Sequence, residues 1–310
     1  MESNAQGNPG LQGPSRWAVV ACLRVVVAAQ CVGIAGRYHI SAWESESYIF
    51  EYLVFQAGVS EGFAQAVDDT GAYLCLAAGV LFSLRLLSNL ETTRANRTRW
   101  MAIFRWLELI AAGFVAVWFV ADALAHTERG GIFSELTIGE VAVRFACPLA
   151  LILLTQPNVR QTNKASLTAR WILTLAISTT FIVHGFKSLQ LYGPFCDLIL
   201  LTDLRLFQLE LSQSTAETAL VIIGWIDILI AVAMLVTRYK PIATYMIFWG
   251  LITSASRMTA FGWMAWPETL VRAANWGAVL AVLLLWQWES AQTDNRETPI
   301  QKFISRQYSR

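Results

Sequence analysis

Six residues in the second half of this chain have side chains suited to a binding site. They lie within or at the ends of long apolar segments, where a charged group is costly unless it is paired or functional. Most of them fall at a similar depth when counted from the segment ends, so we expect them to converge on one pocket that opens outward. Asp227 is the deepest, and we expect it to pair with Arg257 or His184. The predicted ligand-binding residues are His184, Lys187, Asp227, Arg257, Arg272 and Asn275.

The chemistry of these side chains suits a quinone or another small amphiphile. Histidine and arginine can donate hydrogen bonds to a quinone oxygen and stabilise the anion that forms on reduction. The alternative is that the same residues only hold four helices together by polar contacts. For any single residue, this structural role is as good an interpretation as ligand binding. For the whole set we favour a pocket, because packing alone does not need so many polar groups. The residues do not identify a catalytic group.

Other kinds of site find little support in the sequence. A bis-histidine haem needs two imidazoles on facing helices inside the membrane, but His39 and His126 fall in predicted outer loops. No nucleophile motif of a hydrolase triad is present. The cysteines show neither Cys-x-x-Cys spacing nor a zinc pattern, so no metal site is predicted. They are Cys22, Cys31, Cys75, Cys147 and Cys196.

Five further charged residues are interpreted as structural. The first two lie at similar distances from the predicted cytoplasmic boundary, so we expect them to form an ion pair in the inner leaflet. The others belong to two Glu-x-x-x-Arg sequences, which place an acid and a base on one helix face where the chain enters lipid. The base of the second sequence, Arg272, also belongs to the predicted pocket. The five residues are Arg24, Glu108, Glu140, Arg144 and Glu268.

The elements that position these residues are predicted to be membrane-spanning helices. Hydrophobic residues make up 55% of the chain and charged residues only 15%, against about 25% charged in an ordinary soluble domain. A bilayer core needs roughly 20 apolar residues for each helix. We therefore predict an all-α, polytopic membrane protein whose first partner is the lipid bilayer. The eight predicted spans are residues 17–36, 70–88, 101–124, 138–155, 169–187, 215–237, 241–262 and 268–288.

Loop charges orient these spans. Region 85–105 holds five arginines and one glutamate, and region 156–170 holds three bases and no acid, whereas regions 37–69 and 188–217 are acidic. The positive-inside rule places the basic side and both termini in the cytoplasm, which indicates a multi-pass protein of the cell inner membrane. Each acidic loop also contains an apolar stretch too short to span, which we expect to lie in the outer interface: residues 48–55 and 198–207.

The chain is interpreted as two copies of a four-helix unit in parallel orientation. The fourth and eighth spans share the Glu-x-x-x-Arg opening, and the first and fifth both begin with Arg-Trp. Matches that recur in order indicate an internal repeat. The first copy has few polar residues inside its spans, so we interpret it as degenerate. The predicted divisions are a disordered cytoplasmic tail (1–15), an N-terminal repeat (16–156), a cytoplasmic linker (157–168), a C-terminal repeat with the polar pocket (169–288) and a cytoplasmic tail (289–310).

The C-terminal half resembles the DoxX-like family, small four-helix membrane proteins that also occur in doubled forms. The resemblance runs through four short motifs on consecutive spans: Phe181–Gly185, Trp225–Asp227, Trp249–Arg257 and Glu268–Asn275. It implies a membrane redox system, either as a subunit of quinone-linked thiosulfate oxidation or as a partner of thiol-handling proteins, and therefore a membrane or periplasmic redox partner. The chain lacks the cysteine pair of the redox members, which does not favour disulfide exchange.

Three functions remain open on this evidence. The leading one is a membrane component of a redox or respiratory system, with a quinone or small amphiphile in the pocket. The sequence leaves open whether the chain itself is a subunit with oxidoreductase activity. The second is a small-solute carrier, because tandem halves and intramembrane charges occur in transporters. The third is a non-catalytic membrane scaffold or assembly factor. A net charge of +1 gives no general case for a nucleic-acid partner.

Overall fold

The computed structural model describes residues 16–40, 46–91, 98–156 and 163–296. Within these ranges the chain is helical and contains no strand, as predicted for the fold class. The predicted tail at 1–15 lies outside the described residues, and so do parts of the predicted linker and C-terminal tail. In the described parts of those two segments, helices continue beyond the predicted limits, from Asn163 at one end and up to Arg296 at the other.

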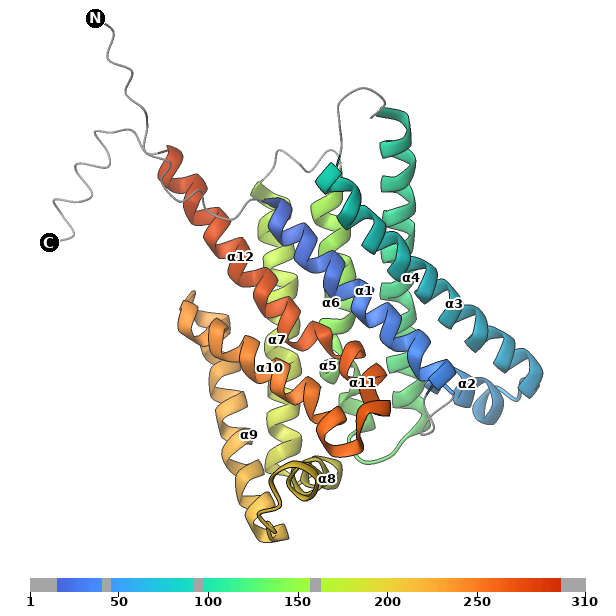
Figure 1. Ribbon diagram of the computed structural model, residues 1–310, viewed down its shortest axis with the longest axis vertical. Coiled ribbons are helices and arrows are strands. Elements are labelled where there is room, and N and C mark those ends of the chain that lie inside the picture. The colour runs from blue at the N-terminus through green and yellow to red at the C-terminus, as the bar shows by residue number, and fades with distance from the viewer. Residues whose placement is uncertain (1–15, 41–45, 92–97, 157–162, 297–310) are drawn as a thin grey trace, which may run out of the picture.

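The first half contains three long helices and a broken one (Figure 1). Residue Val141 interrupts the broken helix, where the backbone leaves helical geometry at φ −102° and ψ 11°. The long helix before it extends further than predicted and contains His126, which was expected in a loop. The elements are α1 (Arg16–Ile40), α2 (Tyr48–Glu51), a π-helical turn (Tyr52–Gln56), α3 (Glu61–Glu91), α4 (Thr98–Arg129), a 3-10 turn (Ser134–Leu136), α5 (Thr137–Glu140) and α6 (Ala142–Thr155).

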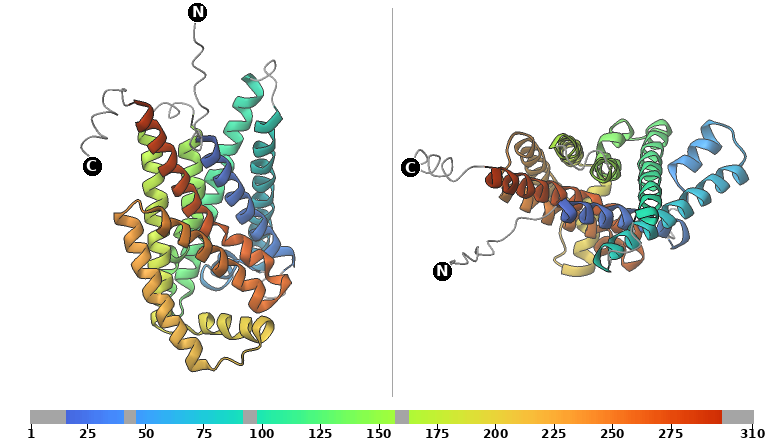
Figure 2. Two further views of the ribbon diagram at one scale, coloured as in Figure 1. Left: turned by 60° about the vertical axis from the view of Figure 1, so that its left-hand side comes forward. Right: turned by 90° about the horizontal axis from the view of Figure 1, so that it is seen from above.

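The second half has the same order of elements. Its last helix is also interrupted, at Arg272, and the two pieces are bent by 42°. The predicted interfacial stretches of both halves form short helices that continue into a π-helical turn, and Figure 2 shows α8 lying crosswise at the end of the bundle. The elements are α7 (Asn163–Leu189), α8 (Gly193–Thr202), a π-helical turn (Asp203–Phe207), α9 (Gln213–Val236), α10 (Lys240–Phe261), a 3-10 turn (Trp263–Ala265), α11 (Trp266–Val271) and α12 (Ala273–Arg296).

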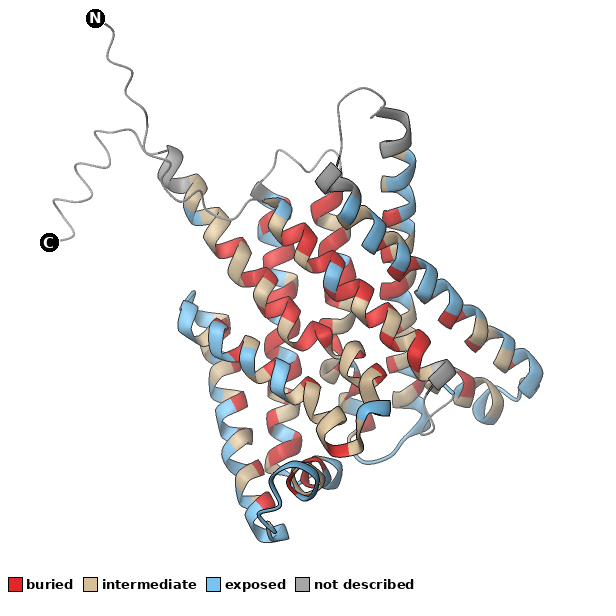
Figure 3. Ribbon diagram, viewed as in Figure 1, coloured by how far each residue is buried: buried red, intermediate tan, exposed pale blue. Residues whose placement is uncertain are grey.

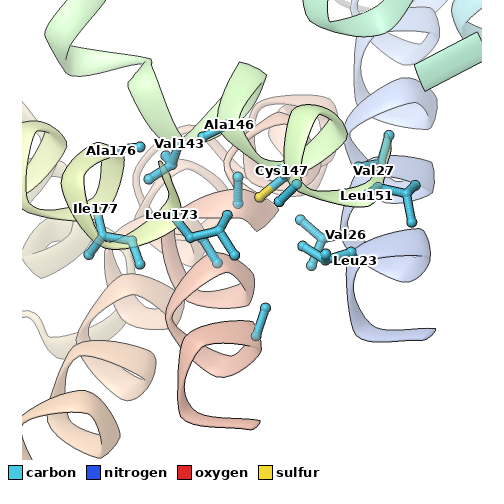
Figure 4. Packing of buried hydrophobic residues seen from close by; sticks show 14 of the residues in the cluster. Leu23, Val26, Val27, Val143, Ala146, Cys147, Leu151, Leu173, Ala176 and Ile177 are labelled. Atoms are coloured by element: carbon cyan, nitrogen blue, oxygen red, sulfur yellow. The ribbon is translucent and has the colours of Figure 1, made fainter. Parts of the chain in front are cut away.

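Four helices, α1, α6, α7 and α12, form the buried centre of the molecule (Figure 3). Small and branched apolar side chains from these helices interlock, among them Leu23, Cys147 and Leu173, as seen in Figure 4. Close approach of α1 and α12 depends on Gly277, where a Cβ would lie 2.1 Å from a methyl carbon of Val26. The centre is therefore packed tightly enough to fix the positions of the helices around it.

The surrounding helices α3, α4, α9 and α10 expose large apolar side chains, including Leu84, Ile110, Leu229 and Phe248. A soluble protein would bury such residues, whereas lipid solvates them. Six helices are long and apolar enough to cross a membrane, and a seventh is added if the bent pair α11 and α12 counts as one span. The fold is thus that of a helical bundle compatible with a multi-pass membrane protein.

Helix α10 was predicted as the seventh of eight spans. It is not among the six helices that are long and apolar enough to cross a membrane. It contains 22 residues, which at about 1.5 Å rise per residue reaches across a bilayer core. Its sequence includes Arg257 and several hydroxyl side chains in the second half, and these lower its hydropathy. The residues that weaken it as an apolar span are therefore candidates for the site.

Candidate functional site

A cavity of about 300 Å³ lies in the C-terminal half, between α7, α9, α10 and α12. Helix α8 and the π-helical turn after it contribute its outer wall, with apolar side chains such as Phe195, Leu198 and Phe207. Ile223 and Ile252 add further apolar surface from α9 and α10. A mainly apolar hollow of this size with a few polar groups is the usual form of a small-molecule site.

Five of the six predicted site residues line this cavity. They come from four elements that are distant in sequence, so only the folded bundle brings them together. The five are His184, Asp227, Arg257, Arg272 and Asn275. Lys187, the sixth, does not line the cavity; its ammonium group lies 2.5 Å from Glu140 Oε2 instead. Whether the five bind a ligand stays a prediction.

Asp227 is buried in the middle of α9 with 4% of its surface exposed. Its Oδ1 forms no hydrogen bond of regular geometry, although the indole Nε1 of Trp249, which lines the same cavity, lies near enough to interact with the carboxylate. The expected ion pair of Asp227 with Arg257 or His184 is wrong, because the carboxylate forms no ion pair with either residue. A buried carboxylate oxygen without a regular hydrogen bond is costly.

Arg257 and Arg272 have different surroundings. The Arg272 guanidinium pairs with the Glu268 carboxylate four residues earlier, as predicted, and also donates to the Glu268 carbonyl oxygen at 3.0 Å. Arg257 donates only to the neighbouring Ser256 Oγ, at 3.0 Å, within the described chain. The helix break at Arg272 also frees its carbonyl oxygen, which accepts from Ser254 Oγ at 3.1 Å.

Glu140 does not pair with Arg144, contrary to the interpretation of the first Glu-x-x-x-Arg sequence. It accepts from Lys187 and lies 3.6 Å from His184 Nε2, so α5 is tied to α7 of the other half. The helix break at Val141 separates Glu140 from Arg144 and removes the regular four-residue spacing. Arg144 Nε is buried with no partner among the residues that the structure describes.

The predicted ion pair of Arg24 and Glu108 is present, with two hydrogen bonds of 2.6 and 3.0 Å. Arg85 adds a third contact, at 3.2 Å from Glu108 Oε2. The Glu108 side chain is only 1% exposed, so both of its oxygens are satisfied in a buried position. This arrangement has the character of a structural tie rather than a binding site.

Sequence reasoning missed three features near the site. Arg37 of α1 pairs with Glu268, which is 231 residues away in the sequence. Arg37 is the only strong base in the acidic region 37–69, and this could have indicated that it pairs with an acid. Trp249 was named only within the Trp249–Arg257 motif and not as a residue of the site, although it lines the cavity. Tyr192 lies under Lys187, with the ammonium nitrogen 5.0 Å from the ring centroid, and burial raises the pKa of its phenol.

The described residues contain no group of three or more His, Cys, Asp and Glu side chains placed to hold a metal ion. Cys31 of α1 and Cys75 of α3 are adjacent, fully buried and free. Their spacing in sequence gave no sign of this proximity. They lie on α1 and α3, two helices that contribute nothing to the cavity wall.

No protein-family model matches this chain significantly, and neither does any curated protein or solved structure. The chemistry of the site therefore follows from its own residues. The cavity wall includes the Asp227 carboxylate and the Trp249 indole N–H, neither in a regular hydrogen bond, and the guanidinium of Arg257. Such a site can hold a small molecule that has polar groups at one end and an apolar body.

Proposed function

We propose that this chain is a DoxX-like integral membrane protein that binds a small amphiphile in the cavity of its C-terminal half. In this proposal it is a component of a membrane redox or respiratory system, and a quinone is the first ligand to test. The observation that carries the proposal is the buried Asp227 Oδ1 without a regular hydrogen bond at the wall of an apolar cavity. A hydroxyl group on a ligand, such as that of a quinone in its reduced quinol form, could donate to that oxygen and offset the cost of leaving it unsatisfied.

The proposal includes eight spans arranged as two parallel four-helix repeats. Its support is the recurring element order together with the packing. In each half the first long helix packs on the second, as α1 on α3 and α7 on α9, and the third packs on the last. The last helix of each half also packs on the first helix of the other, as α6 on α7 and α12 on α1. In this arrangement α10 is a span whose polar side chains face the cavity.

Extraction of the purified full chain tests amphiphile binding directly. The protein is isolated in mild detergent, and its bound lipids and quinones are quantified by mass spectrometry. We expect one ligand species in near-stoichiometric amount. Ile223→Trp should remove it by filling the cavity, whereas Leu229→Trp on the same helix should not, because Leu229 is 64% exposed. Equal ligand content in the two variants would rule out the cavity as the site.

Functional assays separate the redox proposal from its alternatives. Deleting the gene should shift the redox state of the quinone pool or the rate of oxygen uptake if the role is redox. Solute flux in liposomes that contain only this protein would instead indicate a carrier. A stable co-purifying protein, with neither of these effects, would indicate a scaffold.

Reporter fusions test the proposed topology, with both termini in the cytoplasm. Three sites should read cytoplasmic: Asn96, Asn163 and Thr293. Three should read outside: Ser47, Arg129 and Ser212. A single disagreement would mean a miscounted span, and two would overturn the eight-helix arrangement.

A further inference from the structure

The arginine side of the cavity has hydrogen-bond donors that the protein does not use. Arg257 and Arg272 both line the wall, and Glu268 neutralises only the second of them. No carboxylate of the described ranges lies within ion-pair distance of Arg257, which donates to Ser256 Oγ alone. A guanidinium carries five N–H donors in a planar fork, so most of those of Arg257 remain for a ligand.

The charges around Arg257 do not compensate its own charge. The acids of this region pair with other bases: Glu268 with Arg37 and Arg272, and Glu140 with Lys187. Arg257 itself has no carboxylate in ion-pair contact within the described chain. In a low-dielectric membrane interior, such a charge is costly without a counter-charge.

The remaining acids of the cavity wall do not supply the missing charge. The Asp203 carboxylate accepts from the backbone N–H groups of Leu209 and Leu211, at 3.1 and 2.9 Å. Asp227 lines the same cavity but forms no ion pair with Arg257. The Arg257 guanidinium therefore faces the cavity with no carboxylate of the described residues in ion-pair contact.

We infer that the cavity holds an anionic amphiphile, with a phosphate group against Arg257 and Arg272 and an apolar body against Leu198 and Ile252. Arginine suits this role because its fork donates two parallel hydrogen bonds to phosphate oxygens. The inference rests on the proposed amphiphile-binding function and narrows the ligand class from neutral quinones to acidic lipids. The phosphate belongs either to a lipid headgroup or to a free phosphate ion, and binding experiments distinguish these sources.

Ligand-induced thermal stabilisation of the purified full chain tests the inference. The probes are dihexanoyl phosphatidic acid, dihexanoylglycerol with the same chains but no phosphate, inorganic phosphate, and a short-chain ubiquinone. Phosphatidic acid should bind at least about tenfold more tightly than dihexanoylglycerol, because each charge-assisted hydrogen bond is strong. Arg257→Gln should abolish this preference and Arg257→Lys should retain part of it. Arg238→Gln, at an arginine that is 53% exposed, is the matched control and should change nothing.

The outcomes separate this inference from the function on which it rests. Stabilisation by inorganic phosphate to the same extent, and with the same dependence on Arg257, supports the anion site and assigns it to free phosphate. Equal binding of the quinone and phosphatidic acid, unaffected by Arg257→Gln, overturns the inference but keeps a ligand in the cavity. If no probe stabilises the chain and Ile223→Trp leaves its bound lipids unchanged, both proposals fail. If Arg257→Gln does not fold, the comparison of the four probes on the wild-type chain and on Ile223→Trp decides.

Discussion

Two buried carboxylates, one in each half of the chain, have opposite surroundings. Glu108 in the N-terminal half is held by Arg24 and Arg85, with contacts from 2.6 to 3.2 Å. Asp227 in the C-terminal half has an oxygen without a regular hydrogen bond in the described structure and faces a cavity. Both are almost completely buried, so burial alone does not distinguish a structural acid from a candidate binding group. What distinguishes them is whether the protein itself completes the hydrogen bonding.

The histidines differ in the same way. His126 of α4 stacks on Tyr48 with ring centroids 3.9 Å apart, and its Nδ1 lies 3.2 Å from Thr137 Oγ1. His184 of α7 borders the cavity, and its Nε2 is 3.6 Å from Glu140. The first half has thus used its polar side chains to close contacts between helices. In the second half, several polar side chains face the cavity instead.

Removing the paired carboxylate should have the largest effect on stability. Glu108→Ala leaves two buried arginines, Arg24 and Arg85, without this acceptor, and breaking a buried ion pair in this way costs about 3–5 kcal/mol. Thermal or denaturant unfolding in one fixed detergent measures the loss. Glu61→Ala, at an exposed position of α3, is the control and should be nearly neutral. A loss below about 1 kcal/mol for Glu108→Ala would mean that the tie is as dispensable as a surface pair.

A smaller loss is expected where two helices of the second half approach most closely. A Cβ at Gly185 would lie 2.7 Å from the carbonyl oxygen of Gly224, so Gly185→Ala must push α7 and α9 apart. Overpacking of this kind costs about 1–3 kcal/mol. Gly113→Ala meets no atom within 4 Å and should be neutral or slightly stabilising. Both variants are compared by the unfolding assay, and equal stabilities would show that α7 and α9 can separate freely. Because α7 and α9 both line the cavity, Gly185→Ala should also weaken ligand retention.

The smallest effect on stability is expected at Asp227. Asp227→Asn replaces an unsatisfied carboxylate by a neutral amide of the same shape, so the free energy of unfolding should fall by no more than about 0.5 kcal/mol or should rise. Ligand content should nevertheless drop several-fold, as measured by mass spectrometry of the extract. Asp197→Asn, at an exposed position of α8, is the matched control. A large loss of stability would show that Asp227 is a structural acid like Glu108, and the contrast between the halves would disappear.

Asp227→Ala sharpens the same test. If Asp227 paired with Arg257, alanine would harm the protein more than asparagine, because it would deprive Arg257 of an acceptor. Since the structure shows no such pair, alanine should differ from asparagine only through the lost side-chain volume.

The sequence was informative where hydrophobicity and length decide. The cores of the long helices, the short helices 48–51 and 193–202, and the Arg24–Glu108 pair were all predictable, because lipid imposes apolar runs of fixed length and penalises unpaired charge. The convergence of His184, Asp227 and Arg257 on one cavity also followed from counting depth. The ligand role of these residues and the repeat remain predictions.

The sequence could not show which groups pair. The Glu140–Arg144 spacing assumed an unbroken helix, and the interruption at Val141 depends on tertiary packing that no local pattern encodes. The contact of Arg37 with Glu268 joins residues at opposite ends of the chain. The depth of a residue in the membrane can be predicted from the sequence of its own helix. The rotation of that helix about its axis depends on the neighbouring helices. This rotation determines which way Asp227 and Arg257 point, and in the structure they do not meet.

The packing of the last helix on the first has a consequence for biosynthesis. As the ribosome delivers the helices in order, α1 enters the membrane long before α11 and α12, the elements that cover it, have been made. A nascent chain that has not reached residue 268 cannot yet give Arg37 the Glu268 carboxylate. Until translation ends, α1 therefore keeps much of its eventual contact surface against lipid or a chaperone. Truncations after α10 should be more prone to degradation than their missing length alone suggests, because they leave α1 without the helices that cover it.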